Sequence, residues 1–328
     1  METKKNRGII PPVKDQRVLY VPVGCGKCME CKKQKSRQWQ VRLTEDLKHN
    51  KNAWFVTLTF SDTELIKLER ENTELTGYNL DNEVCRIAVR RYTERWRKKY
   101  KKTIRHWLVT ELGHQGTERV HMHGIVWTKE KEDIEKIWKY GKVYIGEYVN
   151  NKTINYIIKY VNKIDELHRE YNGKIYTSQG IGKKYIERKD SKRNKYKKNG
   201  TRETYKTKEG IELALPIYYR NKIYSEEERE KLWLEKLDKN KRYVLGREID
   251  GDNEKDYQRA LYEARKKNKR QGYGNNEKNW ELKKYEEERR NIKKKERIKK
   301  AYGEPTPKVA YVPNGHVILP NGAFYNED

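Results

Sequence analysis

Apolar and polar positions alternate with two different periods in the middle of the chain, and each period predicts a different element. Residues 54–60 (WFVTLTF) follow the two-residue period of a strand, whereas residues 83–100 carry apolar side chains at helical spacing. The same criteria predict strands over 106–112, 119–127 and 142–149, and helices over 129–139 and 153–164. The order β-α-β-β-α-β-α is that of the split βαβ arrangement. We therefore expect an α+β fold: an antiparallel four-stranded sheet with helices on one face, and one more helix after it.

The segments on either side of this region are more polar. A basic helix is expected over 36–50, a loop or ribbon over the lysine- and tyrosine-rich residues 183–208, and charged helical blocks over 225–303, broken near 244–252 and 272–276. We divide the chain into an N-terminal segment with the cysteines and the basic helix (1–50), the sheet domain (51–170), a basic tyrosine-rich extension (171–224), a charged helical region (225–303) and an extended or disordered tail (304–328).

The composition adds a strong positive charge to this picture. Lys and Arg number 76 against 49 Asp and Glu, which leaves a formal charge of +27, and 25 Tyr and 8 Trp accompany them. Such a surface attracts polyanions, and its aromatic rings can stack on bases, so nucleic acid is the expected partner. The alternatives are a highly soluble protein or one that associates with the ribosome.

The shortage of apolar residues sets limits of its own. They make up 34% of the chain, which predicts one or two small cores. There is no apolar run of 18 residues and no apolar stretch near the start, so we expect no membrane span, no secretory signal and a soluble, cytoplasmic protein. The Gly-x4-Gly-Lys-Ser/Thr phosphate loop is absent, so any unwinding of a duplex would need a helicase from elsewhere.

Two histidines in the predicted third strand form the first chemical pattern. His121 and His123 alternate with apolar residues, so both imidazoles project from one face of the sheet. Pairing Leu112 with Val120 across the hairpin places Glu111 beside His121 and on the same face. Two imidazoles and one carboxylate can hold a divalent cation with positions left for a substrate oxygen. The alternative is a pair of surface histidines, or histidines that contact nucleic acid.

Two tyrosines on the predicted helix 153–164 form the second pattern. The aliphatic residues of this helix share one side, which frees the opposite side for Tyr156, Lys159, Tyr160 and Lys163. Beside a bound cation, a tyrosine hydroxyl could attack a DNA phosphate and store the bond as a phosphotyrosine. Lys159 or Lys163 would balance the negative charge that develops. This spacing also arises by chance in a chain so rich in Tyr and Lys.

At these residues the sequence resembles the HUH endonucleases that initiate rolling-circle replication. Their motifs run in the same order: an apolar strand ending in Thr-x-Thr (55–60), His-hydrophobic-His (121–123) and Tyr-x-x-Lys-Tyr (156–160). The initiators of microviruses, single-stranded DNA bacteriophages, and their gokushovirus branch in particular, are similar over further segments. These are Gly24–Cys31 with the basic helix, Ser178–Gly182 (SQGIG) and Leu215–Tyr219 (LPIYY), so that the resemblance covers about residues 20–225.

The resemblance implies a ferredoxin-like or RRM-like βαββαβ fold and a Mg²⁺ or Mn²⁺ requirement. It implies that the protein nicks single-stranded viral origin DNA in the cytoplasm of a bacterial host, and that the host replication machinery, including a helicase, extends the free end. Two tyrosines imply the subgroup in which they alternate between holding one end and cutting again. Glu111 is the expected third ligand, with His106 and His114 as possible substitutes. The basic residues expected to contact DNA are Lys183, Lys184, Arg188, Lys192 and Arg193.

The cysteines form a third pattern that the nicking chemistry does not explain. Cys25, Cys28 and Cys31 are spaced as C-x2-C-x2-C, which favours a metal site, with zinc as the leading candidate. A closed zinc site needs a fourth ligand, and Cys85, His49 or an unidentified residue could supply it. An iron–sulfur cluster, or reduced thiols without a metal, are alternatives.

Other classes of protein could carry the same patterns. A plasmid initiator, a relaxase or a transposase would use the same chemistry. A non-catalytic nucleic-acid-binding protein would use the tyrosines for stacking and the cysteines for a zinc knuckle. A metallohydrolase of the barrel type would need more His and Asp at strand ends than the second half provides.

Overall fold

A computed structural model describes residues 15–18, 24–114, 118–198 and 200–273, together with short pieces beyond residue 289. It combines helices with antiparallel sheets, which confirms the α+β class. A 3-10 turn, η1 (Gln16–Val18), precedes the first long helix. Among the described residues, no helix is both long enough and apolar enough to cross a membrane.

The main sheet has five strands in the order β4-β1-β3-β2-β5, and every neighbouring pair is antiparallel. The strands are β1 (Ala53–Leu58), β2 (Arg105–Leu112), β3 (Val120–Trp127), β4 (Val143–Ile145) and β5 (Ile175–Thr177). The first four follow the predicted chain order, although β4 is shorter than expected. The fifth strand was not predicted, because three residues are too few to show an alternation.

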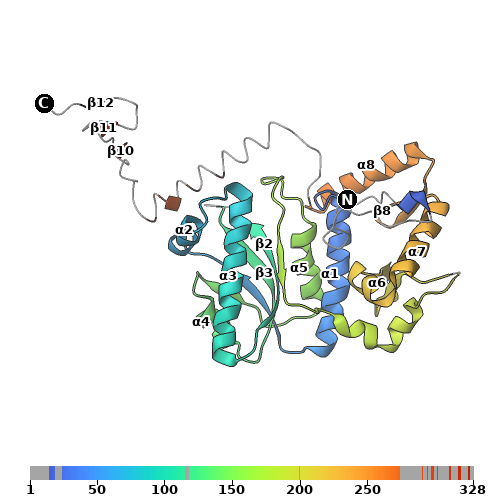
Figure 1. Ribbon diagram of the computed structural model, residues 1–328, viewed down its shortest axis with the longest axis horizontal. Helices are drawn as coiled ribbons and strands as arrows, with labels where there is room; N and C mark the ends of the chain where they lie inside the picture. The colour runs from blue at the N-terminus through green and yellow to red at the C-terminus, as the bar shows by residue number, and fades with distance from the viewer. Residues whose placement is uncertain are drawn as a thin grey trace.

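Helices cover both faces of this sheet (Figure 1). One face packs against α2 (Asp62–Arg70), α3 (Gly77–Tyr100) and α4 (Glu132–Trp138), and the other against α1 (Met29–His49) and α5 (Asn151–Asn162). The expectation of helices on one face, with one more helix after the sheet, understated the second layer. The reason is that the strands are apolar on both sides: Val56 and Leu58 face one layer, while Trp107 and Ile125 face the other.

The protein also has two smaller cores beyond the two faces of the sheet, so the expected limit of one or two cores is wrong. One is built largely from tyrosines, with Val41, Leu215 and Leu232 among them. The other joins Met29 and Ile164 to the C-terminal helical region. Tyrosine rings bury a large apolar surface, which compensates for the few aliphatic residues.

The basic segment is more ordered than the loop or ribbon that its charge suggests. It forms η2 (Lys183–Glu187) and η3 (Lys189–Asn194), followed by the hairpin β6 (Thr204–Lys206) and β7 (Glu212–Ala214). Its anchor is Gly182, whose φ of +72° and close approach to Arg42 leave no room for a side chain. A Cβ there would lie 2.5 Å from the Arg42 carbonyl oxygen. The SQGIG motif therefore docks the basic segment onto α1.

The charged region contains α6 (Ile217–Ile223), α7 (Glu226–Asp238) and α8 (Glu254–Arg270). The predicted break near residues 244–252 is confirmed, because the hairpin β8 (Lys241–Val244) and β9 (Arg247–Asp250) lies there. Most of the predicted helical block after residue 276 and most of the tail lie outside the described residues. The described parts of the tail are β10 (Ala310–Tyr311), β11 (Val317–Ile318) and β12 (Phe324–Tyr325), which pair in one antiparallel sheet.

Candidate functional site

The hairpin β2–β3 brings Glu111, His121 and His123 together on one face of the sheet. Leu112 pairs with Val120 and Glu111 with His121, so the predicted register is confirmed. Glu111 Oε2 lies 3.1 Å from His123 Nε2 and 3.4 Å from His121 Nε2. All three side chains have candidate ligand atoms within 4.8 Å of one another.

Neighbouring groups orient both imidazoles. His121 Nδ1 lies 3.2 Å from the Arg119 carbonyl oxygen, which can only accept, so Nδ1 carries the proton. The neutral ring then presents the lone pair of Nε2 to Glu111. His123 Nδ1 lies 3.0 Å from Thr57 Oγ1, the first threonine of the Thr-x-Thr motif. Lone pairs and a carboxylate that converge on one point attract a cation.

The protonation states at this point are those that a cation needs. Burial raises the pKa of Glu111, but hydrogen bonds from His121 and His123 outweigh it and hold that pKa well below its usual range. Burial lowers the pKa of His123 against the opposing pull of Glu111. An ionised carboxylate and a neutral imidazole are the forms that bind metals.

Helix α5 carries the two tyrosines above this group. Asn150 caps the helix through a capping box, and Ile154, Ile157 and Val161 bury its apolar side against the sheet. The Tyr160 ring stacks on His123, with ring centres 4.1 Å apart and planes inclined by 8°. Its hydroxyl donates to the Tyr156 hydroxyl over 2.7 Å.

The two phenols differ in their surroundings. Tyr156 is 48% exposed and packs edge-on against Phe55 of β1. Tyr160 is half-buried, and burial together with the hydrogen bond to Tyr156 raises its pKa well above the usual value. One phenol thus faces solvent while the other lies against the histidines.

The two predicted lysines also occupy different places. Lys163 Nζ lies 3.5 Å from Glu111 Oε1 and 3.4 Å from His114 Nε2. Lys159 is exposed, with its Nζ 5.7 Å from the centre of the Tyr156 ring. Lys163 therefore belongs to the histidine group and Lys159 to the exposed tyrosine.

A further cluster, not predicted as a group, adjoins Lys163. His114 Nε2 and His168 Nδ1 lie 3.0 and 2.7 Å from Asp165 Oδ2, and His168 Nε2 lies 2.8 Å from Glu118. The D-x-x-H spacing was the only signal in the sequence. This largely buried cluster ties the chain after α5 to the end of β2. His114 is therefore engaged here rather than with Glu111.

His106, the other possible substitute for Glu111, also lies elsewhere. Its Nδ1 is 3.1 Å from the Ile104 carbonyl oxygen and 3.2 Å from Ser178 Oγ. It stands five residues before Glu111 on β2, which is roughly 17 Å along a strand. His106 is thus no substitute for Glu111.

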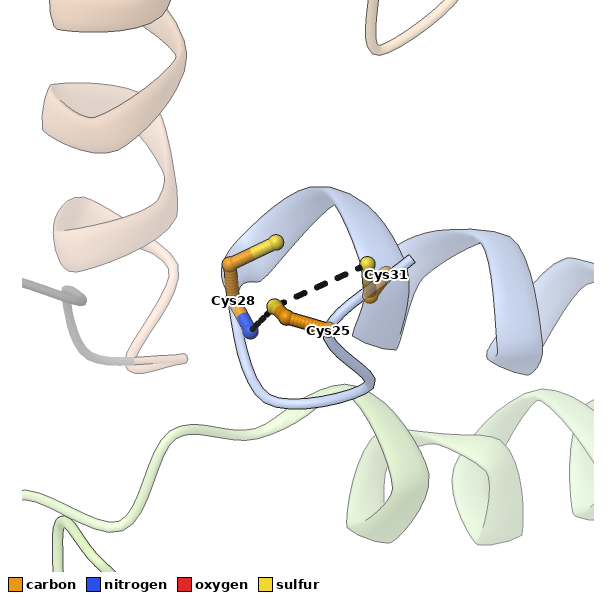
Figure 2. Close-up of side chains that lie close together, drawn as sticks. All are labelled: Cys25, Cys28 and Cys31. Carbon is orange, nitrogen blue, oxygen red and sulfur yellow. Dashed lines mark hydrogen bonds between the residues drawn. The ribbon is translucent and has the colours of Figure 1, made fainter. Parts of the chain in front are cut away.

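The three clustered cysteines gather where α1 begins (Figure 2). Cys25 Sγ lies 3.9 Å from Cys31 Sγ and accepts a hydrogen bond of 3.3 Å from the Cys28 N–H. Hydrogen bonds from the backbone N–H groups of Cys28 and Lys27 lower the pKa of Cys25 to about 7, whereas burial raises that of Cys28 to about 11.

Neither residue suggested as a fourth ligand is near these thiols. Cys85 is fully buried in α3, in the core on the opposite face of the sheet from α1. His49 is the last residue of α1, whereas the cysteines lie at its start, roughly 30 Å away along the helix. The expectation that Cys85 or His49 completes the site is therefore wrong.

The expected DNA contacts in the basic segment divide into two groups. Lys183, Lys184 and Lys192 are exposed. Arg188 instead pairs with the buried Glu45 of α1 over 2.7 Å, and Arg193 pairs with Glu212 over 2.7 Å. The two arginines hold the basic segment in place and are less free to bind phosphates than the three lysines.

Comparison with known proteins identifies one kind of relative. Residues 53–165, from β1 to the end of the α5 region, match a family of replication-associated proteins named after ORF2. The replication-associated protein ORF2 of Spiroplasma virus 4 is 26% identical to the chain, in an alignment that covers 62% of the chain and 68% of that protein. No solved structure matches the chain significantly. The matched segment contains Glu111, both histidines and both tyrosines, so the candidate site lies within the region that resembles viral replication-associated proteins.

Proposed function

We propose that the protein initiates replication of a single-stranded viral genome by cutting origin DNA through a covalent tyrosine intermediate. The observation that carries the proposal is the stack of Tyr160 on His123, bonded through its hydroxyl to Tyr156. It puts two nucleophiles beside a group of cation ligands. The similarity to viral replication-associated proteins supports a role in replication, and the net charge of +27 supports DNA as the partner.

The residues present fit a divalent cation. His121, His123 and Glu111 would hold it, with Mg²⁺ or Mn²⁺ as the proposed ion, and Thr57 would keep His123 oriented. When bound, such an ion polarises a phosphate and neutralises charge on its non-bridging oxygens.

The chain's own side chains would carry the transfer. A tyrosine oxygen forms a bond to phosphorus, the bond from phosphorus to the 3′ oxygen breaks, and that oxygen takes up a proton. One phosphoester replaces another, so the strand can be resealed without ATP. Lys163, next to Glu111, is placed to balance the charge on the phosphate or the leaving oxygen.

Two adjacent phenols suit a repeated reaction. One tyrosine would hold the 5′ phosphate while the free 3′ hydroxyl primes synthesis by the machinery of a bacterial host cell, including its helicase. The other would cut again after a round of synthesis. The hydrogen bond between the phenols would allow a proton to pass from one to the other.

The test uses single tyrosine replacements and their combination. Tyr156→Phe and Tyr160→Phe should each leave partial cleavage of an origin oligonucleotide in Mn²⁺, and the double variant should form no covalent adduct. Tyr148→Phe is the matched control, because Tyr148 is exposed and lies before α5. Full activity in the double variant contradicts the proposal.

The proposal has alternatives with the same chemistry and with none. A plasmid initiator, a relaxase or a transposase would differ in the DNA that it recognises. A non-catalytic zinc-containing nucleic-acid-binding protein is favoured by one observation, the three thiols at the start of α1. It would form no adduct with DNA.

Zinc is the ion that we assign to Cys25, Cys28 and Cys31. With a Zn–S bond of about 2.3 Å, the edge of a tetrahedral site is about 3.8 Å. The Cys25–Cys31 sulfur distance is 3.9 Å. Cys85 takes no part, so the fourth position would belong to water or to a ligand from outside the described residues.

A further inference from the structure

A small cleft opens beside the candidate site, between α1 and α5. Its lining includes Tyr160 and Glu111, which the site already uses, and Lys163. It also includes Lys32 and Lys35, which the proposed chemistry does not use. These two lysines lie about one turn apart on α1, just after the last of the clustered cysteines.

Lys32 is held in the cleft by the packing of α1 on α5. Its ammonium donates to the Lys163 carbonyl oxygen over 3.2 Å, and one turn later Ser36 donates to the Ile158 carbonyl oxygen over 3.3 Å. Gln40 continues this ladder by donating to Asn155 over 2.8 Å. The ammonium of Lys32 is therefore positioned by the backbone of the helix that carries the tyrosines.

The positive charge of these lysines is not balanced locally. Lys32 is 7% exposed, and within the described part of the chain no carboxylate forms an ion pair with Lys32 or Lys35. The nearest acid, Asp165, already accepts from His114 and His168. Burial lowers the pKa of Lys32 to about 8 and also lowers that of Lys35, as expected for ammonium groups without a counter-ion.

The size of the cleft limits what can balance that charge. Water-sized groups have about 30 Å³ in which to sit, which is room for roughly two water molecules. The oxygens of one phosphate fit such a space, but a nucleobase does not. A cleft lined by buried ammonium groups is suited to an anion.

We propose that Lys32 and Lys35 bind a backbone phosphate of single-stranded DNA, adjacent to the phosphate that is cut. This inference rests on the proposed function, since it requires a DNA strand to cross the site. Tyr160 and Glu111 line both the cleft and the candidate site, so a phosphate in the cleft is a near neighbour of the reacting one. Lys32 and Lys35 are then positioning residues, which fix the register of the strand against the tyrosines.

The test measures binding, without cleavage, in the full-length Tyr156→Phe/Tyr160→Phe protein. Origin oligonucleotides carry one uncharged methylphosphonate at successive positions. One position next to the cut site should weaken binding roughly tenfold, the loss expected when a charged hydrogen bond disappears. This scan needs no lysine variant, so it stands even if such a variant folds poorly.

Lysine variants then identify the contact. With Lys32→Gln and Lys35→Ala added, the same methylphosphonate should cause no further loss, and the slope of log affinity against log salt should fall by about 0.7. Lys98→Ala is the control, because Lys98 is exposed on α3, across the sheet from α1. It should change neither measurement.

Two results overturn the inference. One is a flat methylphosphonate scan. The other is an unchanged loss in the lysine variants. If the scan is flat but inorganic phosphate protects Lys32 and Lys35 from acetylation, the cleft binds free phosphate and the DNA assignment is wrong. Failure of the proposed function is separate: a protein with the predicted binding pattern that never cuts DNA keeps the cleft and loses the chemistry.

Discussion

Thr57 and Lys163 illustrate how single residues complete the candidate site. Thr57 lies opposite His123 in the sheet, and its hydroxyl meets the ring nitrogen that faces away from Glu111. Lys163, the residue that ends α5, reaches Glu111 from the other side. The histidines and Glu111 are thus oriented by hydrogen bonds from two further elements, β1 and α5, which is typical of sites that bind metals.

The cysteine thiols should differ in reactivity. Cys25 has a pKa of about 7 and Cys28 one of about 11, so at pH 7.5 iodoacetamide should modify Cys25 much faster than Cys28. Because the rate follows the thiolate fraction, labelling of Cys25 should level off above pH 8, whereas that of Cys28 should still rise. Peptide mass spectrometry measures both rates.

The same experiment includes its own control. Cys85 is fully buried, and burial raises its pKa, so it should react only after unfolding. Stoichiometric zinc should protect the three clustered cysteines together. Equal rates at Cys25 and Cys28, or zinc protection of one thiol alone, would contradict the proposed zinc site.

At the scale of elements, α1 organises the molecule. It packs on α5 through the ladder that starts at Lys32, and on its other side it binds the SQGIG loop. Asp46 accepts from the Gly182 N–H over 2.8 Å, and Tyr219 of the LPIYY motif donates to the Gly182 carbonyl oxygen over 2.8 Å. Three segments that share the microvirus resemblance thus meet at this helix.

Gly182→Ala should therefore be costly. A side chain at φ +72° would strain the backbone and press on Arg42, so we expect the free energy of unfolding to fall by about 3 kcal/mol. Gly200→Ala is the matched control, since Gly200 has φ +86° but open space around it, and should cost about 1 kcal/mol. Urea denaturation measures both, and equal losses would mean that the contact with α1 contributes nothing.

Local patterns in the sequence predicted the elements of the candidate site well. The register of β2 and β3 followed from pairing Leu112 with Val120, because a slip of one residue would turn Glu111 into the core. The exposed face of α5 followed from its helical period. The fifth strand, the burial of Lys32 and the His168 cluster were not predictable in this way, because each depends on contacts between segments far apart in the sequence.

At the scale of the whole molecule, the charge of +27 should separate DNA binding from cutting. Phosphate contacts supply most of the affinity for nucleic acid, whereas the histidines serve the reaction. His121→Ala with His123→Ala should abolish metal-dependent cleavage and change the affinity for single-stranded DNA by no more than about threefold. Fluorescence anisotropy over a range of salt concentrations measures the binding.

A complementary pair of variants gives the opposite result. Lys183→Ala with Lys184→Ala removes two exposed charges and should lower both the affinity and its salt dependence, by about 0.7 in the slope for each lost contact. Cleavage at saturating DNA should persist. If the histidine variant loses binding as fully as it loses cleavage, the histidines support the fold and are not a metal site.

Mass spectrometry of the peptide that remains attached to a cut oligonucleotide tests the central claim most directly. Trypsin cleaves after Lys152, Lys159 and Lys163, so it separates Tyr156, on peptide 153–159, from Tyr160, on peptide 160–163. We predict a nucleotide phosphate on the tyrosine of one or both peptides, formed only with Mg²⁺ or Mn²⁺. An oligonucleotide that is cut without any attached peptide, or that is attached at a residue outside α5, would contradict the account.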